Sequence, residues 1–474
     1  MSHANTDEQD AIVDAAKASR SNLMISALAG TGKTSTLELL ERAVPRGPIL
    51  YLCFNKKNAD EAAKRMLSTT TVRTFNSIGH RIWAASQSRN LSLDSRKSNN
   101  ILRGIIDNAP KDYKETLWSV YHDVLAGVSL AKALGYIPPK AYPNAKRLIS
   151  RPVFHRSLDE IPDDLTADLI DTVLQRSIKQ SYEGLIDYND QIYMPALFGG
   201  AYPQFPLVLV DEYQDLSPVN HALLRKLVRG RLIGVGDPWQ NIYGFRGASA
   251  RGIEEAKETY TCEGLPLSIS FRCPSAIVRN VHWHVPHFKW FTEGGNVDKP
   301  SKINVHDIAD DSTIICRNNA PILAVAFRLL AAGRSISIAG SDIGPRLIGI
   351  MKKLGPETLR RDGVLASIKE WEADRLEKES KTASDMAACM RIFALQGKDL
   401  TGAMAYAKHI FDQRGRILLT TGHKAKGLEW ENVIHLDPWL VRKEPSSQNK
   451  NLDYVISTRS SDRLTEIDSE MIEW

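Results

Sequence analysis

The chain of 474 residues is too long for one ordinary hydrophobic core, so we expect two to four domains. Its 43% hydrophobic and 25% charged residues are typical of a soluble globular protein, and its net charge of +5 permits a polyanionic partner without establishing one. Five scattered cysteines without C-x-x-C spacing argue against a disulfide framework or a zinc site and favour a reducing cytoplasm. A polar, acidic start and the lack of a long apolar run argue against a signal sequence and a membrane partner.

The first informative stretch combines a helix, a strand and a phosphate loop. Helical spacing over Asp7–Ala18 leads into an apolar strand that begins at Leu23, and the loop AGTGKT then has the looser A-x-x-x-x-G-K-T form of a phosphate loop. Lys33 would reach the β- and γ-phosphates, and Thr34 would place its hydroxyl on Mg²⁺. Gln9 lies just upstream, where its carboxamide could pair with an adenine edge, although a lone Gln is usually a surface residue. Backbone N–H groups of the loop would surround phosphate oxygens, and its residues are Ala29, Gly30, Thr31, Gly32, Lys33 and Thr34.

Two further predicted strands, Ile49–Phe54 and Thr70–Phe75, end in polar and aromatic side chains. Asn55 follows the first strand, and Thr74 and Phe75 close the second. Amides, hydroxyls and an exposed ring at strand ends suit a nucleic-acid backbone with one base stacked on the ring. Packing of Phe75 in the core is an equal alternative.

From about Lys97 to Glu183 the pattern changes to helices separated by loops, without a phosphate-type motif. We interpret this stretch as a helical insertion into the first α/β domain. A separate domain is the alternative, but it would require the phosphate-loop sheet to be complete before Lys97. The strands that follow argue against that.

A predicted buried strand, Leu207–Val210, ends in two carboxylates, at the edge where open α/β sheets bind ligands. Asp211 would hold Mg²⁺, and Glu212 would orient or deprotonate the attacking water, whereas a helix N-cap is the plainer interpretation of two such acids. The next strand, Leu232–Val235, is followed by Gln240, which is placed to sense the γ-phosphate. Three later residues could face a nucleic-acid strand or pack in the core: Tyr243, Phe245 and Arg246.

Eight motifs together resemble a known family: TDEQ from Thr6, AGTGKT, TFNSIG, VDEYQD, GDPWQNIYGFRGA, SFRCP, GHKAKGLEW and NLDYVISTR. In order and approximate spacing they resemble superfamily 1 DNA helicases of the UvrD/Rep type, over nearly the whole chain. The resemblance implies an α/β fold with two RecA-like parallel-sheet domains and helical insertions. It also implies an ATP-hydrolysing DNA helicase that uses ATP and Mg²⁺.

By the same resemblance, residues of the second half have roles at both ligands. Phe271 would stack on adenine, and Arg272 would contact the γ-phosphate. Glu429 would lie near the ribose. Arg459 resembles an arginine finger, a residue type that contributes about 10³ to 10⁵ in rate. Two further residues would lie near DNA: His423 and Lys424.

The second half also has the pattern of an α/β domain. Thr313–Cys316, Ser335–Ala339 and Ile417–Thr421 are predicted strands. Pro345–Arg414 is charged and helical, and it occupies the place of the family's second insertion domain but looks shorter than is usual there. The His-rich stretch His282–Phe291 matches no zinc pattern, so we favour packing or a partner surface.

These observations give a domain plan and a functional expectation. The plan is a first RecA-like domain in 1–95 and 187–275 with a helical insertion at 96–186, and a second RecA-like domain in 276–344 and 415–474 with a short helical insertion at 345–414. Closure of the two domains on ATP and their release after hydrolysis would drive movement along single-stranded or tailed duplex DNA in the cytoplasm. The resemblance implies 3′ to 5′ movement. Two alternatives remain: a translocase that displaces bound proteins without processive unwinding, and a nucleotide-dependent DNA-binding switch.

Overall fold

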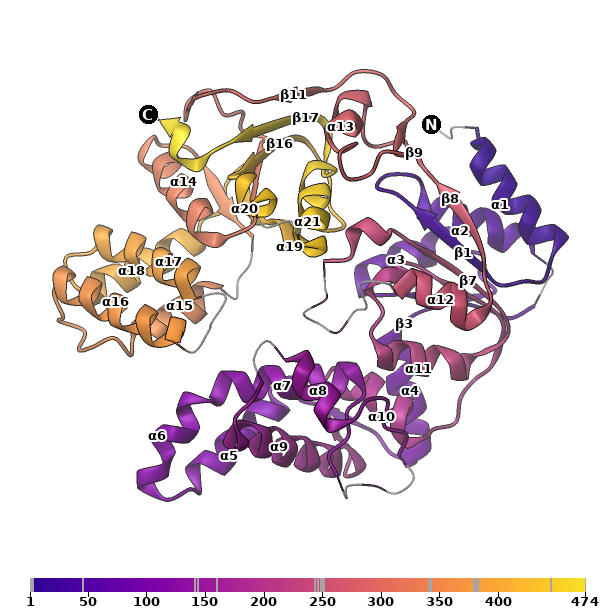
Figure 1. Ribbon diagram of the computed structural model, residues 1–474, viewed down its shortest axis with the longest axis horizontal. Coiled ribbons are helices and arrows are strands. Elements are labelled where there is room, and N and C mark those ends of the chain that lie inside the picture. Colours follow the sequence, from indigo (N-terminus) through magenta and orange to yellow (C-terminus); the bar gives the residue numbers. More distant parts are fainter. Residues whose placement is uncertain are drawn as a thin grey trace. The chain divides into compact units, whose positions relative to one another are not determined.

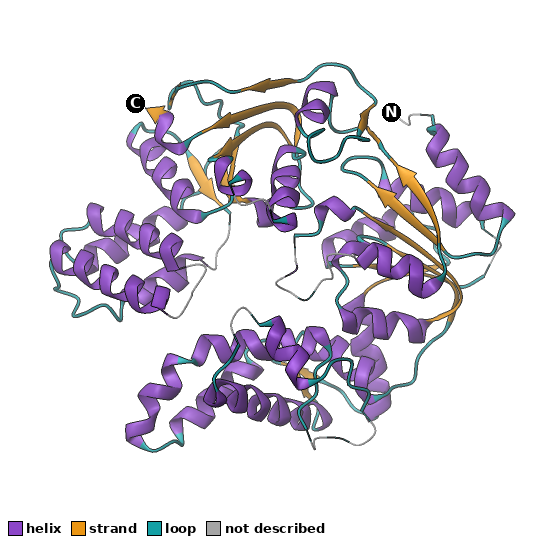
Figure 2. Cartoon of the chain, viewed as in Figure 1, coloured by secondary structure: helices purple, strands orange, loops and turns teal. Residues whose placement is uncertain are grey.

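The computed structural model describes residues 4–473 except 45–46, 140–141, 143–144, 159–160, 243, 245–246, 248–251, 340–342, 378–382 and 444–445 (Figure 1). The chain divides into two compact units. Unit 1 comprises residues 1–28 and 32–267, and unit 2 comprises residues 29–31 and 268–474. Each unit contains a six-stranded sheet with helices beside it (Figure 2).

The sheet of unit 1 has the strand order β3-β2-β6-β7-β1-β8, and all its pairs are parallel. Its inner strands are short apolar runs; β2, for example, is buried at all five positions, as expected for a parallel strand covered on both faces. The strands are β1 Leu23–Ala27, β2 Ile49–Cys53, β3 Thr70–Thr74, β6 Phe205–Val210, β7 Val228–Gly236 and β8 Glu263–Leu267.

Helices cover both faces of this sheet. Because side chains alternate along a strand, Leu50 and Leu52 enter one core cluster, whereas Ile49, Tyr51 and Cys53 enter the other. The helices next to the sheet in the chain are α1 Asp7–Ala18, α2 Lys33–Ala43, α3 Lys56–Arg65, α4 Phe75–Gln87, α10 Asp190–Phe198, α11 Pro218–Leu227 and α12 Gly252–Tyr260.

The helices that the structure describes between α4 and α10 extend the first of these clusters. They are α5 Lys97–Asp107, α6 Lys111–Ser119, α7 Tyr121–Leu134, α8 Arg151–Ser157 and α9 Asp164–Tyr182. Leu102, Phe154 and Ile170 belong to the same buried cluster as Leu50. The helical stretch and the sheet of unit 1 therefore share one continuous core. Two short strands, β4 Ser92–Leu93 and β5 Leu185–Ile186, pair where the chain enters and leaves it.

The sheet of unit 2 has the order β11-β17-β16-β13-β15-β14, again with parallel pairs. Its strands are β11 Asn296–Asp298, β13 Thr313–Cys316, β14 Ile336–Ile338, β15 Ile417–Thr421, β16 Trp430–Leu436 and β17 Ser460–Ile467. Two small parallel pairs accompany it: β9 Ile269–Ser270 with β10 Lys289–Trp290, and β12 Ile303–Asn304 with β18 Ile472–Glu473. The helices beside these strands are α13 Ser275–Asn280, α14 Asn319–Ala331, α19 Gly422–Ala425, α20 Trp439–Arg442 and α21 Ser447–Ser457.

Four helices between β14 and β15 form a cluster with its own core. They are α15 Ile343–Met351, α16 Arg361–Glu377, α17 Ala383–Gln396 and α18 Leu400–Phe411. Ile368, Met390 and Ile410 are fully buried in this core, which also includes Leu323 of α14. The cluster is thus anchored to the helix that follows β13.

The predicted fold class, α/β with two parallel sheets and helical insertions, is confirmed. In the two six-stranded sheets, strands β8, β11, β16 and β17 were not predicted, and Phe75 opens α4 instead of closing a strand. In the part of the chain that the structure describes, every helix is too short or too polar to cross a membrane.

Candidate nucleotide site and nucleic-acid interface

The loop after β1 leaves the N-terminus of α2 open to an anion. Gly30 and Gly32 have φ angles of +70° and +80°, in the left-handed region that favours glycine. Gly32 is the N-cap of α2, and because it has no side chain it cannot cap the first N–H groups of the helix. The first turn contains no acidic residue, and Lys33 and Thr34 begin the helix in half-buried positions. Such a terminus suits phosphate oxygens.

The tip of this loop, residues 29–31, belongs to unit 2. Three hydrogen bonds of 2.9 Å hold its backbone: Phe271 N donates to Gly30 O, Ser270 Oγ donates to Ala29 O, and Ala29 N donates to the Tyr454 hydroxyl. Thr31 is buried. A Cβ at Gly30 would lie 2.4 Å from the Cβ of Arg272, so no larger residue fits there without movement.

Gln9 is 5% exposed, in contrast to the usual surface Gln. Its Nε2 donates to Thr36 Oγ1 of α2 at 3.2 Å, and its Oε1 accepts from the backbone N–H of Thr6 at 3.0 Å. The carboxamide therefore ties the start of α1 to the helix that begins with Lys33. Its role toward adenine stays a prediction.

Asp211 lies directly after β6. In the sheet β6 is next to β7, and β7 is next to β1, so the C-terminal ends of these three parallel strands lie side by side at this edge. Its carboxylate accepts hydrogen bonds from the Tyr51 hydroxyl at 2.8 Å and from the Glu212 N–H at 2.9 Å. Burial, and then the charge of Glu212, raise the pKa of Asp211 to about 6, while Tyr51 and the nearby Lys33 act in the opposite direction. Lys33 and Asp211 are therefore electrostatic neighbours.

A chain of side-chain contacts connects Glu212 with Gln240. Gln214 Nε2 donates to Glu212 Oε2 at 2.6 Å, and Gln214 Oε1 accepts from the Asp237 N–H at 2.9 Å. Asp237 in turn accepts from Gln240 Nε2 at 2.7 Å. Burial raises the pKa of Asp237, with Lys33 acting against it. The predicted base and the predicted γ-phosphate sensor are thus joined within unit 1.

Sequence reasoning missed Tyr51, Gln214 and Asp237, which bind the predicted residues. Asp237 could have been found, because it follows β7 as Asp211 follows β6. Tyr51 gave no comparable signal, since its contact with Asp211 depends on which strands are neighbours in the sheet.

The residues at this edge fit Mg²⁺ with ATP. Mg²⁺ is usually held by one or two carboxylates together with substrate phosphates. Among the described residues no group of three or more His, Cys, Asp or Glu side chains could hold a metal ion by itself. Asp211 and Thr34 would supply the protein ligands, and the open N-terminus of α2 beside Lys33 would supply donors to the phosphates.

We expect Asp211→Asn to be more stable than the wild type at pH 7.5 by about 2 kcal/mol, with most of this difference lost at pH 4.5. The pKa of Asp211 lies near 6 when folded, against an ordinary 3.8, so the folded protein binds more protons between these values. The free energy of unfolding therefore falls as pH rises through this window. Urea unfolding of the variant and the wild type, without Mg²⁺ and at both pH values, measures the difference in the free energy of unfolding. Asp14→Asn is the control, because Asp14 is exposed. If Asp211→Asn and the wild type differed in stability equally at both pH values, the prediction would be wrong.

The predicted nucleic-acid residues of unit 1 lie at the ends of β2 and β3. Asn55 is exposed and caps α3 by accepting from Asn58 N at 2.8 Å, and Thr74 caps α4 by accepting from Ser77 N at 3.1 Å. Phe75 is only 2% exposed and belongs to the core cluster of the sheet. Each of these residues therefore has a structural contact besides its predicted role. Tyr243, Phe245 and Arg246 lie outside the described residues.

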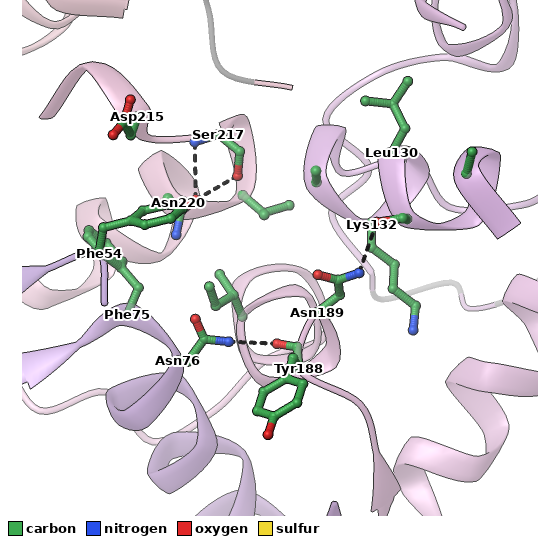
Figure 3. Close-up of a pocket in the computed structure, with 15 residues that line it drawn as sticks. Phe54, Phe75, Asn76, Leu130, Lys132, Tyr188, Asn189, Asp215, Ser217 and Asn220 are labelled. Carbon is green, nitrogen blue, oxygen red and sulfur yellow. Dashed lines mark hydrogen bonds between the residues drawn. The ribbon is translucent and has the colours of Figure 1, made fainter. Parts of the chain in front are cut away.

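A pocket of about 510 Å³ opens beside these strand ends. Figure 3 shows Phe54, Phe75 and Asn220 on one side of it and Leu130 and Lys132 of α7 on the other. Its lining also includes Asn76, Tyr188 and Asn189. An aromatic and amide lining suits a nucleobase, which offers a π face and hydrogen-bonding edges.

The nucleotide residues predicted in unit 2 have side-chain partners within that unit. Arg272 forms an ion pair with Glu429, although the two were expected at the γ-phosphate and the ribose. The ring of Phe271 lies 5.0 Å from that of Phe291, tilted by 40°. Phe291 is half exposed and its N–H donates to Ser270 O, so the two rings stand side by side directly after β9 and β10. Phe291 was not predicted.

Arg459 is buried, and its guanidinium donates to backbone carbonyls of Val455 at 2.8 Å and Leu428 at 3.0 Å. His423 and Lys424 lie together on α19, half-buried and exposed respectively. The His-rich stretch packs within unit 2: His282 contacts Phe288 O at 2.8 Å and His284 contacts Asn451 at 3.0 Å.

Comparison with known proteins agrees with the motifs. Residues 6–261 match the family described as UvrD/REP helicase N-terminal domain. The chain is 23% identical to F-box DNA helicase protein 1 of Schizosaccharomyces pombe, over 90% of this chain and 52% of that protein. It is 27% identical to ATP-dependent DNA helicase UvrD1 of Mycobacterium tuberculosis, over 51% of this chain and 34% of the relative. It is 26% identical to DNA helicase II of Escherichia coli, over 56% of this chain and 38% of the relative.

The chain spans about half the length of the first of these relatives and less of the other two. The family match extends over more than half of the 474 residues and includes the phosphate loop and both acidic strand ends. This chain therefore belongs to the UvrD/Rep family of superfamily 1 helicases.

Proposed function

We propose that this chain is an ATP-dependent DNA helicase that moves 3′ to 5′ on single-stranded DNA. The observation that carries the proposal is one edge of the sheet of unit 1. There, Lys33 at an uncapped helix N-terminus lies within electrostatic reach of the buried acids Asp211 and Asp237. A cation, a carboxylate pair and open N–H groups at adjacent parallel strand ends suit a nucleoside triphosphate with its metal ion.

In this proposal each residue of the site has a stated task. Lys33 binds the β- and γ-phosphates, and Glu212 accepts a proton from the attacking water. Mg²⁺, held by Thr34 and Asp211, would neutralise charge that develops on the phosphate oxygens. Gln240 senses the γ-phosphate, and the contacts through Asp237 and Gln214 carry that signal to Glu212.

Unit 2 contributes further contacts to the same nucleotide. Phe271 stacks on the adenine, Glu429 binds the ribose, and Arg272 and Arg459 stabilise charge on the γ-phosphate. Arg272 must then exchange its ion pair with Glu429 for phosphate oxygens, and Arg459 must exchange its hydrogen bonds to the Val455 and Leu428 carbonyls. ATP and ADP therefore favour different arrangements of these side chains, which is the condition for coupling hydrolysis to movement.

The single strand binds at the ends of β2 and β3 and in the pocket of Figure 3. Asn55 and Thr74 donate to its backbone, and Phe75 supports a base. Unit 2 adds His423 and Lys424 on α19. The segment with Tyr243, Phe245 and Arg246 follows Gln240 directly, so one stretch of chain serves both ligands. A cytoplasmic setting fits the five free cysteines.

Unwinding of duplexes with a single tail tests the proposal. We expect ATP hydrolysis to rise on addition of single-stranded DNA, and a duplex with a 3′ tail to be separated while one with a 5′ tail is not. Separation of the 5′-tailed duplex alone would contradict the polarity. Displacement of a bound protein without strand separation would identify a translocase, and slow hydrolysis that DNA does not accelerate would identify a binding switch.

A further inference from the structure

Four charged side chains are buried together at the pocket of Figure 3, and one of them, Lys132, belongs to its lining. Lys97 of α5 and Lys132 of α7 are each 1% exposed, and the two carboxylates come from Asp187 and Asp190. We name these four residues the buried quartet. Burying a charged side chain costs free energy unless the charge is paired and hydrogen-bonded. The burial of four charges in one place therefore calls for a structural or functional explanation.

The charges of the quartet sum to zero, and each ammonium lies close to three oxygen atoms. Lys97 Nζ donates to Asp190 at 2.7 Å, and also to the Ser177 carbonyl and the Ser181 hydroxyl of α9 at 2.7 Å each. Lys132 Nζ lies 2.7 Å from a carboxylate oxygen of each aspartate and donates to the Ser177 hydroxyl at 2.9 Å. Lys97 thus uses all three of its donors, and Lys132 makes two hydrogen bonds and one further ion pair.

The quartet fixes one short turn, residues 187–190. Asp187 accepts from the Asp190 N–H and Asp190 accepts from the Asp187 N–H, both at 2.9 Å, so each aspartate binds the backbone of the other. Between the two buried aspartates, Tyr188 is 57% exposed and Asn189 is exposed. Buried charges therefore flank two exposed side chains that line the pocket.

Contacts from the pocket side hold the same turn. Asn76 Nδ2, directly after Phe75, donates to Tyr188 O at 2.7 Å, and Asn189 Nδ2 donates to Ser129 Oγ of α7 at 3.2 Å; Figure 3 shows both. The turn is bound from α4 on one side and from α5, α7 and α9 on the other. Polar contacts therefore hold this turn from both sides.

We infer that the buried quartet consists of positioning residues for the DNA interface. It holds the turn so that Tyr188 and Asn189 present one fixed surface to a single strand in the pocket. The protein therefore loses less conformational entropy when the strand binds. Replacement of a complete buried charge cluster by neutral residues can leave stability unchanged, so stability alone does not require these charges. The inference rests on the proposed function, because it assumes that the pocket binds DNA.

The test compares the wild type with a neutral variant: Lys97→Met, Lys132→Met, Asp187→Asn and Asp190→Asn together. This variant loses two positive and two negative charges, so its net charge, and the general attraction of DNA phosphates, are unchanged. We expect its dissociation constant for a fluorescent oligothymidine to rise about tenfold, with affinity for a fluorescent ATP analogue unchanged. Lys226→Met is the control for loss of a lysine away from the pocket, since this half-buried lysine donates to the Ala196 carbonyl at 2.8 Å and, unlike Lys132, does not line the pocket.

A double-mutant comparison separates positioning from a general structural role. If the quartet acts through the turn, Tyr188→Ala should weaken oligothymidine binding in the wild type but add little in the neutral variant. Additive losses, or unchanged binding by a folded neutral variant, would overturn the inference. If the neutral variant does not fold, Asp187→Asn decides in the same way, because its amide oxygen can still accept from the Asp190 N–H. A wild type that fails to bind oligothymidine refutes the proposed function instead.

Discussion

Replacing Lys33 by alanine is expected to lower DNA-stimulated ATP hydrolysis by about 10³-fold or more. Lys33 is the first residue of α2, and its charge lowers the pKa values of both Asp211 and Asp237. It is thus the cation that faces the two buried acids. Without it, the β- and γ-phosphates would lose the cation of unit 1 that opposes the charges of Asp211 and Asp237. Steady-state hydrolysis with saturating single-stranded DNA measures the effect.

Lys17→Ala is the matched control for Lys33→Ala. Lys17 is an exposed lysine in the last turn of α1, so its removal changes net charge equally but leaves the phosphate loop intact. We expect this control to hydrolyse ATP at the wild-type rate. Affinity for a fluorescent ATP analogue should fall in Lys33→Ala and not in Lys17→Ala. Turnover by Lys33→Ala within a few-fold of the wild type would remove Lys33 from its proposed role.

The strands that position the site could be predicted because they are nearly all apolar. Leu207–Val210 is an unbroken buried run, and its end at Asp211 was predicted at the correct residue. β17 was missed because polar residues interrupt it, including Glu466, which is 4% exposed. Glu466 is tolerated there because Arg442 binds it at 2.7 Å, a tertiary contact that no local pattern reveals. Local pattern therefore predicts strands whose burial is apolar and misses those whose burial depends on ion pairs.

The candidate site shows the same limit. Types and order of residues sufficed to nominate Lys33, Asp211 and Gln240, since Lys33 begins a helix, Asp211 follows β6 directly and Gln240 lies in the short turn after β7. Their partners Tyr51 and Gln214 depend on the strand order β2-β6-β7, which the sequence does not display. Burial was equally invisible: a phenylalanine after a strand can face solvent or the core, and only the packing of α4 places Phe75 in the core.

Glu212→Gln is expected to reduce DNA-stimulated hydrolysis by about 10²- to 10⁴-fold while ATP still binds. Glu212 has a φ angle of +52°, a left-handed conformation that is uncommon for a residue other than glycine and usually marks a functional constraint. Its carboxylate is held by Gln214 at 2.6 Å. The glutamine side chain has the same shape and an oxygen that still accepts this hydrogen bond, so only the charge and the proton-accepting ability are lost.

Glu38→Gln is the control for this change. Glu38 is another partly buried carboxylate of unit 1 whose pKa is raised by burial, but it pairs with Arg65. We expect it to leave hydrolysis unchanged. Single-turnover hydrolysis and the affinity for a fluorescent ATP analogue should be measured on both variants, so that binding and chemistry are separated.

The two substitutions at the sheet edge, Lys33→Ala and Glu212→Gln, distinguish nucleotide binding from the chemical step. Lys33→Ala should weaken binding and hydrolysis together, because a cation on the phosphates acts in the ground state and in the transition state. Glu212→Gln should lower the chemical step alone, because a proton is accepted only as the water attacks. Removing the charge of Glu212 should also lower the pKa of Asp211, since that charge helps to raise it, and so should not weaken a metal ligand. Full turnover by Glu212→Gln would therefore assign the proton transfer to another group, with the phosphate-binding edge left intact.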